Sequence, residues 1–145
     1  MPIPALPSMW SVYPTGSSTA VKKKIGGNVD AGYIANTCVI RVSYCFNACR
    51  EPIPGSFGGL LTVRGGDGKR YALRVKEFKE FLQSKYRPAD IHGKDRSSVE
   101  GKTGLIMFDV TGWSDATGHF DLWDGSACRG SDYFDKASDV YLWEC

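Results

Sequence analysis

The spacing of apolar residues predicts two amphipathic helices, over residues 37–50 and 74–86. In both segments apolar side chains return every three or four positions, which places them on one face of a helix. Lysine and glutamate occupy the opposite face of the second segment. Pro52 and Pro54 follow the first segment and Pro88 follows the second, and proline ends helices because it lacks an N–H donor.

Alternating or continuous apolar runs predict the strands. Two short strands, 60–63 and 70–73, flank a glycine-rich turn at residues 65–68. The C-terminal half holds longer extended runs, which are a buried strand at 104–110 and alternating segments at 119–124, 132–134 and 140–144. The pattern therefore predicts an α+β fold, with N-terminal helices packed on a C-terminal antiparallel sheet.

Two segments show little periodicity. Residues 1–32 are rich in Pro, Gly, Ser and Asn and are predicted to form an extended or irregular arm, while residues 91–103 are polar and are predicted to form a loop. A chain of 145 residues has the usual size of one domain, so we expect residues 1–145 to form a single domain.

Composition excludes several classes of protein. Hydrophobic residues at 42% and charged residues at 23% fit a folded globular protein. The formal net charge is only +2, and no basic run exceeds the three lysines at 22–24, so nucleic acid is not expected as a partner. No apolar stretch approaches the roughly 18 residues of a membrane span, and no export signal is visible at the N-terminus.

The chain contains five cysteines, more than a cytosolic protein of this size usually holds. If Cys45, Cys49, Cys128 and Cys145 formed two disulfides, which four cysteines can do in three ways, Cys38 would be left over. Disulfides require an oxidising compartment, whereas no export signal is visible. The two observations conflict.

Cys38 directly follows Asn36 and Thr37, two residue types that cap helices, and so falls in the first turn of the predicted helix. A helix N-terminus favours negative charge and therefore the thiolate, which is the nucleophilic form of cysteine. The plain alternative is a buried thiol that behaves as a small hydrophobic side chain. Position alone does not decide between these interpretations.

A thiol nucleophile needs a base, and the chain contains two histidines, His92 and His119. His92 lies in a polar segment and is interpreted as a surface residue. His119 opens a strand whose alternation sends Asp121 and Trp123 to the same face as the imidazole, and that face is free to line a cleft. His119 is therefore the candidate base.

A catalytic imidazole is usually oriented by a third polar group. Folding the chain about residues 125–126 places Asp132 across from His119, so Asp132 is the candidate orienting carboxylate. Asp121 lies two residues along the strand from His119, about 7 Å away by strand rise, so its carboxylate is expected to be farther from the imidazole than that of Asp132. Asp135 is a runner-up for the same role.

Other acidic and aromatic residues are interpreted as follows. Asp139 is a further runner-up for the orienting role, and Asp124 is explained by the Asp-Gly turn that it opens. Trp113 and Trp123 belong to a C-terminal group of aromatic residues that can stack on a sugar or peptide, although most of that group is expected in the core. Together with Asp121, they are the candidate substrate-binding residues.

No motif points to a metal or an organic cofactor, and we expect neither. Cys-x-x-Cys and His-Glu-x-x-His patterns are missing, and Cys45 with Cys49 supplies only two ligands at one-turn spacing. The glycine-rich residues 65–69 lack the spacing of a phosphate-binding loop and are better explained as a turn.

Two segments carry a family resemblance. NTCVIRVSYCFN at residues 36–47 and GWSDATGHFDLWDG at residues 112–125 resemble the fourth class of type VI secretion amidase effectors. The resemblance implies a papain-like, NlpC-type cysteine peptidase fold, with Cys38 as the nucleophile and His119 as the base. Asp132 is placed as the third member by hairpin geometry as much as by likeness.

The resemblance also implies an activity and partners. The expected reaction is hydrolysis of the amide between D-glutamate and meso-diaminopimelate in the stem peptide of peptidoglycan. Expected partners are the type VI secretion machinery, which delivers such proteins into the periplasm of a rival Gram-negative cell, and a cognate immunity protein. Delivery of this kind would reconcile an oxidising compartment with a missing export signal.

Two alternative functions stay open at this point. One is a papain-like protease or deamidating toxin that acts on a protein, and the other is a secreted, non-enzymatic binding domain with structural cysteines.

Overall fold

The computed structural model describes residues 2–110 and 118–145, and it confirms the α+β class. The helices of this part of the chain are α1 (Leu6–Val12), α2 (Ser18–Ile25), the 3₁₀ turn η1 (Gly27–Val29), α3 (Cys38–Ala48), α4 (Val75–Lys85) and the 3₁₀ turn η2 (Arg96–Ser98). The strands are β1 (Thr62–Arg64), β2 (Arg70–Ala72), β3 (Ile91–Gly93), β4 (Gly104–Asp109), β5 (Gly118–Trp123) and β6 (Asp139–Glu144). Both predicted amphipathic helices are present, with ends within two residues of the expected ones.

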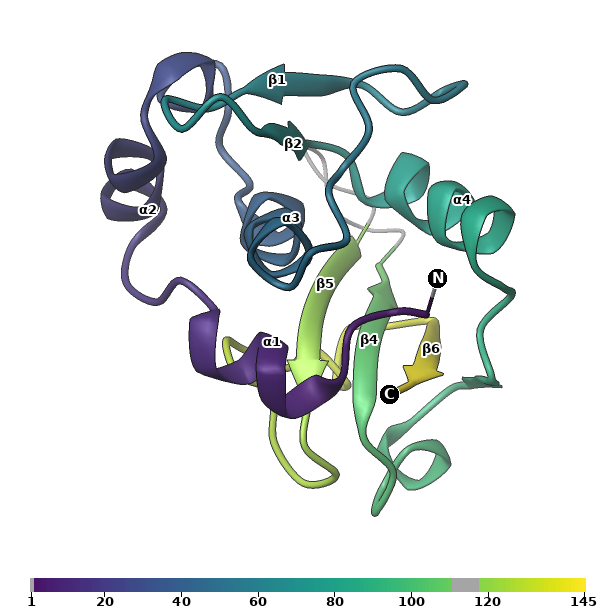
Figure 1. The fold of residues 1–145 in the computed structure, drawn as a ribbon. Helices are drawn as coiled ribbons and strands as arrows, with labels where there is room; N and C mark the ends of the chain where they lie inside the picture. The colour runs from purple at the N-terminus through teal and green to yellow at the C-terminus, as the bar shows by residue number, and fades with distance from the viewer. Residues whose placement is uncertain (1, 111–117) are drawn as a thin grey trace.

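The strands form two antiparallel sheets. The hairpin of β1 and β2 stands apart from a four-stranded sheet with the order β3-β6-β4-β5, in which β5 is an edge strand (Figure 1). In that sheet His119 of β5 lies opposite Phe108 of β4, and Asp121 lies opposite Ile106. An edge strand leaves one side open, and α3 and α1 both contact β5.

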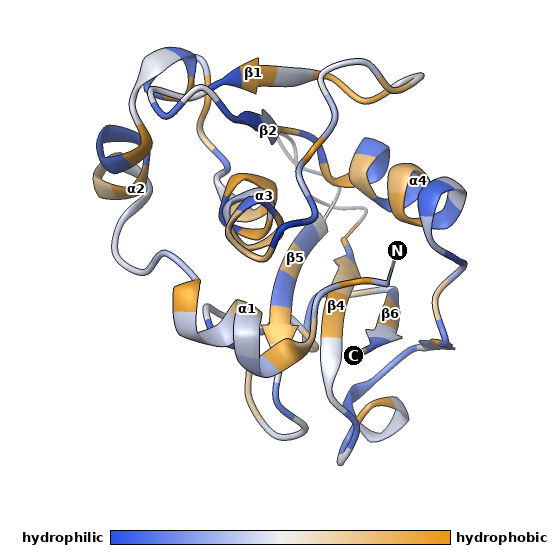
Figure 2. Cartoon of the chain, in the orientation of Figure 1, coloured by the Kyte–Doolittle hydropathy of each residue, from blue (hydrophilic) through white to orange (hydrophobic). Residues whose placement is uncertain are grey.

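The main core lies between the helices and one face of the four-stranded sheet. α1, α3 and α4 contribute Met9, Val42 and Phe78 respectively, and these pack with Phe120 and Leu122 of β5. Figure 2 shows the apolar side of α4 turned toward the rest of the molecule and its charged side turned outward, as the predicted stripe requires. The three helices thus pack against the face of β5 that carries Phe120 and Leu122.

Helix α3 runs through the interior, and its buried Ser43 and Asn47 side chains are both hydrogen-bonded. Ser43 accepts a hydrogen bond from the N–H of Ala72 at 3.0 Å. Asn47 donates to the carbonyl of Arg70 at 2.8 Å and accepts from the N–H of Ile53 at 2.9 Å. These bonds fasten α3 to β2 and to the chain that follows it, because buried polar groups are costly when unpaired.

A second apolar cluster covers the opposite face of the four-stranded sheet. Phe108 and Trp123 are fully buried there, and Tyr133 and Phe134 from the segment after β5 pack over them. The rings of Phe108 and Phe134 meet edge to face, with centroids 4.9 Å apart. The segment that follows β5 therefore lies on this face.

Two predictions about irregular segments were wrong. Residues 1–32 contain α1, α2 and η1, and residues 91–103 contain β3 and η2. The first two helices have fewer than nine residues each, so tertiary packing stabilises them more than their own periodicity does. Strand β3 is polar because it lies at the edge of the sheet, paired only with β6.

The predicted strand at residues 132–134 was also wrong, although its hairpin begins in the predicted register. Trp123 bridges Cys128, and the N–H of Arg129 donates to the carbonyl of Leu122 at 2.9 Å. The pairing then stops, because the next two N–H groups turn to the carboxylate of Asp121. Asp132 is consequently not opposite His119, and the partner of β5 is β4.

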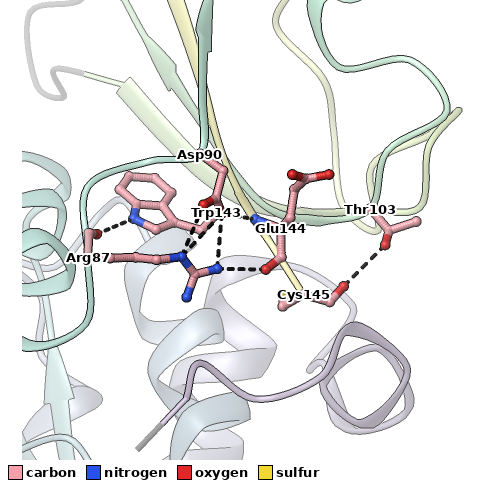
Figure 3. A network of polar contacts seen from close by, with 6 residues as sticks. All are labelled: Arg87, Asp90, Thr103, Trp143, Glu144 and Cys145. Carbon is pink, nitrogen blue, oxygen red and sulfur yellow. Dashed lines mark hydrogen bonds and ion pairs between the residues drawn. The ribbon is translucent and has the colours of Figure 1, made fainter.

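The C-terminal strand is fastened by the polar network shown in Figure 3. Arg87 contacts the carboxylate of Asp90 at 3.0 Å and donates to the carbonyl of Glu144 at 2.8 Å. Asp90 accepts the N–H of Glu144 at 2.7 Å, while the indole of Trp143 donates to the carbonyl of Arg87 at 2.9 Å. The hydrogen bond from Arg87 lowers the pKa of Asp90, which keeps the pair charged.

Among the helices that the structure describes, none has the length and apolar character needed to cross a membrane.

Candidate active site

Cys38 is the first residue of α3, as the capping residues predicted. The side-chain oxygen of Asn36 accepts the N–H of Cys38 at 3.0 Å, and the carbonyl of Thr37 accepts the N–H of Arg41 at 2.9 Å. The first of these bonds satisfies an N–H group that a helix start leaves unpaired, and the second is the first regular bond of the helix. Cys38 is only 4% exposed, and its exposed part lines a cleft of about 470 Å³.

His119 reaches the same cleft from β5, so the structure brings the two predicted residues together. Its side chain is 13% exposed. The Nε2 atom lies 2.7 Å from Oδ2 of Asp121, and the imidazole also shares a hydrogen bond with the side chain of Cys38. Since Asp121 occupies Nε2, Nδ1 is the nitrogen available to the thiol. The ring of Tyr133 packs edge to face on the imidazole, with centroids 4.8 Å apart.

Asp121 is fully buried beneath His119, and four donors surround its carboxylate. Besides the imidazole, it accepts the N–H groups of Leu122 at 2.8 Å, Gly130 at 2.9 Å and Ser131 at 3.0 Å. These bonds fix the carboxylate in place beneath the imidazole ring. The structure therefore places Asp121, and not Asp132, in position to orient the imidazole, while Asp132 lies exposed at the surface.

The environment of His119 alters its proton affinity. Burial by itself lowers the pKa of the imidazole. The hydrogen bonds with Asp121 and Cys38, and the negative charge of these two groups, outweigh this effect and raise the pKa to about 9. At pH 7 the ring is therefore protonated on both nitrogens. It donates through Nε2 to Asp121 and through Nδ1 toward Cys38.

Glycine at position 130 is required by close packing in this carboxylate site. A Cβ atom there would lie 2.7 Å from Oδ2 of Asp121 and 3.0 Å from the hydroxyl oxygen of Tyr13. Tyr13 comes from the segment predicted to be irregular, and it is 5% exposed. Burial and then the charge of Asp121 raise the pKa of Tyr13, so its hydroxyl stays neutral.

The two predicted substrate-binding residues that the structure describes, Asp121 and Trp123, do not line the cleft. Trp123 is fully buried in the second apolar cluster, where its indole donates to the carbonyl of Val99 at 3.1 Å. Asp121 is enclosed by its donors. Trp113 lies outside the described residues. The sequence pattern identified the correct face of β5, but Phe134 and the chain around it cover the end that carries Trp123.

Two arginines line the cleft and were missed. Arg41 lies one turn after Cys38 on α3, and Arg129 directly precedes Gly130 and Ser131, whose N–H groups bind Asp121. The spacing of three residues from Cys38 is a signal that could have identified Arg41, because residues three apart share a helix face. Nothing in the local sequence marks Arg129.

The other cysteines differ from Cys38 in their surroundings. All five thiols are unbridged, so neither of the disulfides considered from the sequence is present. Burial raises the pKa of Cys45, whose sulfur donates to the carbonyl of Met9 at 3.5 Å. Burial likewise raises the pKa of Cys145, to about 11. Within residues 2–110 and 118–145, no three His, Cys, Asp or Glu side chains are grouped as a metal ion would require.

The chain is similar to proteins of known family and structure. The family model described as type VI secretion system, amidase effector protein 4 (Tae4) matches residues 34–143. Tae4 from Enterobacter cloacae is 35% identical, with 99% of each chain covered and a TM-score of 0.90. No curated protein matches the chain.

Complexes of such effectors are similar as well. The Tae4–Tai4 effector–immunity complexes from Enterobacter cloacae and Salmonella Typhimurium contain chains that are 34% and 31% identical to this one. In both comparisons 98% of each chain is covered and the TM-score is 0.90. These matches confirm the predicted papain-like, NlpC-type fold. The chain belongs to the Tae4 family of type VI secretion amidase effectors.

Proposed function

We propose that the protein is a cysteine amidase that hydrolyses the bond between D-glutamate and meso-diaminopimelate in peptidoglycan stem peptides. Cys38 is the proposed nucleophile, His119 the acid and base, and Asp121 the residue that orients the imidazole. The observation that carries the proposal is the contact of one imidazole with both the Cys38 side chain and the carboxylate of Asp121 at the edge of the cleft.

The reaction begins with attack on the scissile carbonyl. The thiolate of Cys38, beside the imidazolium of His119 and the positive end of α3, adds to the γ-carbonyl carbon of D-glutamate. His119 then gives its Nδ1 proton to the diaminopimelate nitrogen, the C–N bond breaks, and the amine leaves. A thioester on Cys38 and a neutral imidazole remain.

Hydrolysis of the thioester restores the starting state. The neutral imidazole takes a proton from water, and the resulting hydroxide adds to the thioester carbonyl. The C–S bond breaks, which releases the D-glutamyl carboxylic acid and returns the thiolate and imidazolium pair. The acid then gives its proton to solvent. Asp121 accepts the Nε2 hydrogen bond throughout and stabilises the protonated ring.

The oxyanion of the tetrahedral intermediate needs N–H donors. The N–H of Cys38 is the expected donor, and in the structure it is bonded to the side-chain oxygen of Asn36. It becomes available to an oxyanion only when Asn36 turns away. Substrate binding is therefore expected to displace the Asn36 side chain.

The family relation supports the proposed partners. A Tai4-type immunity protein binds this effector in the producing cell, and the type VI machinery delivers the effector into the periplasm of a target Gram-negative cell. The complexes of similar effectors with Tai4 support the first of these partners.

Purified sacculi provide the test. The unaltered protein is expected to release muropeptides with new diaminopimelate amino termini, and Cys38→Ala is expected to release none. Cys49→Ala is the matched control, because Cys49 follows the other end of α3 and does not line the cleft. Equal release by Cys38→Ala, or cleavage of proteins without new diaminopimelate termini, would contradict the proposal.

A further inference from the structure

The cleft beside Cys38 has an unbalanced positive charge. The guanidinium groups of Arg41 and Arg129 both line it, and none of the described lining residues is an aspartate or glutamate. Neither arginine forms an ion pair with an acidic residue in the part of the chain that the structure describes. A concave site lined by cations of this kind suits an anionic group on the ligand.

Arg129 presents the end of its guanidinium for such a group. Its Nε donates to the carbonyl of Trp10 at 3.3 Å, and the guanidinium lies over the indole ring of Trp10, 5.5 Å from the centroid. Among the described residues, no hydrogen-bond acceptor engages its two terminal nitrogens. Two terminal N–H groups side by side match the two oxygens of a carboxylate.

Arg41 forms more hydrogen bonds than Arg129 and lies closer to Cys38 in the sequence. Its guanidinium donates to the carbonyls of Pro14 at 3.0 Å and Gly16 at 2.9 Å, and to the hydroxyl of Thr37 at 3.2 Å. Each terminal nitrogen of a guanidinium carries two N–H groups, so one on each is left for a ligand. Its Cβ atom lies about 5–6 Å from that of Cys38, one turn away on α3.

We propose, on the basis of the amidase function proposed above, that Arg41 and Arg129 bind the α-carboxylate of the D-glutamyl residue. A γ-linked glutamyl residue keeps this carboxylate, and only a short chain separates it from the carbonyl that Cys38 attacks. In a stem with a residue after diaminopimelate, the free carboxylate of diaminopimelate lies at the far end of its side chain. The glutamyl carboxylate is thus the anion nearest the bond cleaved.

The inference predicts a substrate preference. Stem tetrapeptides that carry the glutamyl α-carboxylate are expected to be cleaved with a kcat/KM about 10- to 100-fold above that of matched peptides with an α-carboxamide, because a charge-assisted pair is lost. A third peptide, amidated instead at the free diaminopimelate carboxylate, is expected to be cleaved like the first. Cleavage of all three peptides is followed by chromatography of the product that carries a new diaminopimelate amino terminus, still joined to the fourth residue.

Arginine variants test which groups confer the preference. Arg129→Gln and Arg41→Gln are each expected to lower the ratio of carboxylate to carboxamide cleavage by about tenfold. Arg74→Gln is the matched control, because it removes the same charge from an exposed position paired with Glu77. The ratio compares two substrates in one preparation, so loss of folded protein does not change it.

The outcomes separate this inference from the proposed function. Equal cleavage of the carboxylate and carboxamide peptides by the unaltered protein overturns the inference and leaves the amidase function standing. Slower cleavage of only the peptide amidated at diaminopimelate also overturns it. Failure to cleave any of the three peptides overturns the amidase function and the inference with it.

Discussion

The two histidines of the chain form nearly the same contact in two different environments. His119 Nε2 lies 2.7 Å from Asp121, and His92 Nε2 lies 2.8 Å from Asp139. The side chains of the first pair are 13% and 0% exposed, whereas those of the second are 56% and 26% exposed. Distance alone therefore does not distinguish a candidate catalytic pair from a surface ion pair.

The surroundings of the two carboxylates explain the difference. Three backbone N–H groups fix Asp121, and the imidazole of its partner His119 contacts the thiol of Cys38. The hydrogen bond from His92 lowers the pKa of Asp139, but that pair lies at the surface, with His92 stacked on Tyr141. Water screens such a pair, so it contributes little to stability. The comparison yields four predictions, taken from the largest expected effect to the smallest.

Replacing each histidine in turn tests the comparison most directly. His119→Ala is expected to lower kcat/KM on stem peptides by about 10³- to 10⁴-fold, since it removes both the acid and the base. His92→Ala is expected to leave kcat/KM unchanged and to alter the free energy of unfolding by no more than about 0.5 kcal/mol. A comparable loss of activity in both variants would show that the surface pair is also needed for turnover.

The second prediction compares two aspartates. Asp121→Asn keeps the size of the side chain but removes the charge that stabilises the imidazolium, so kcat/KM is expected to fall by about 10²- to 10³-fold. Asp132→Asn changes an exposed residue and is expected to leave kcat/KM unaltered. Steady-state kinetics with one stem peptide measures both. The opposite result would restore Asp132 as the orienting residue.

The sequence predicted the elements whose signals are local. Helix α3 has an apolar stripe, a cap at Asn36 and a following proline, and α4 has a stripe between charged residues, so both were predicted almost to their ends. Strands β4 to β6 followed from alternation or continuous apolar runs. The placement of Cys38 and His119 at one cleft followed from a helix start and a strand face, together with the family resemblance.

The contact between Asp121 and His119 could not be predicted from local geometry. The expected separation of about 7 Å is the distance along the strand between backbone positions. The side chains of His119 and Asp121 instead lean together to 2.7 Å. The hairpin continued only to Arg129 because the next N–H groups bind the buried carboxylate, and this competition between side chain and ladder is a tertiary effect.

The third prediction is a pH dependence of stability. The pKa of His119 is raised from 6.5 to about 9 in the folded protein, so the folded state binds more protons between these values. The stabilising contribution of the pair is complete below about pH 6.5 and is lost as pH rises through about 9, a change of about 3 kcal/mol.

Urea unfolding at several pH values between 6 and 9.5 measures this contribution. The decline in the free energy of unfolding is expected to persist in His92→Ala and to shrink in Asp121→Asn, because only the second variant removes a cause of the raised pKa. An equal decline in all three proteins would assign it to other groups.

The smallest expected effect concerns the carboxylate site itself. In Gly130→Ala the new Cβ would lie 2.7 Å from Asp121 Oδ2, so the carboxylate or the backbone has to shift. We expect a loss of about 1 to 2 kcal/mol in the free energy of unfolding and about tenfold in kcat/KM, because a displaced carboxylate orients the imidazole less well. Gly58→Ala is the matched control, since no atom lies within 4 Å of its added Cβ. If both variants behave alike, the N–H groups around Asp121 can move without cost, and burial alone would have to account for the difference between the two histidine pairs.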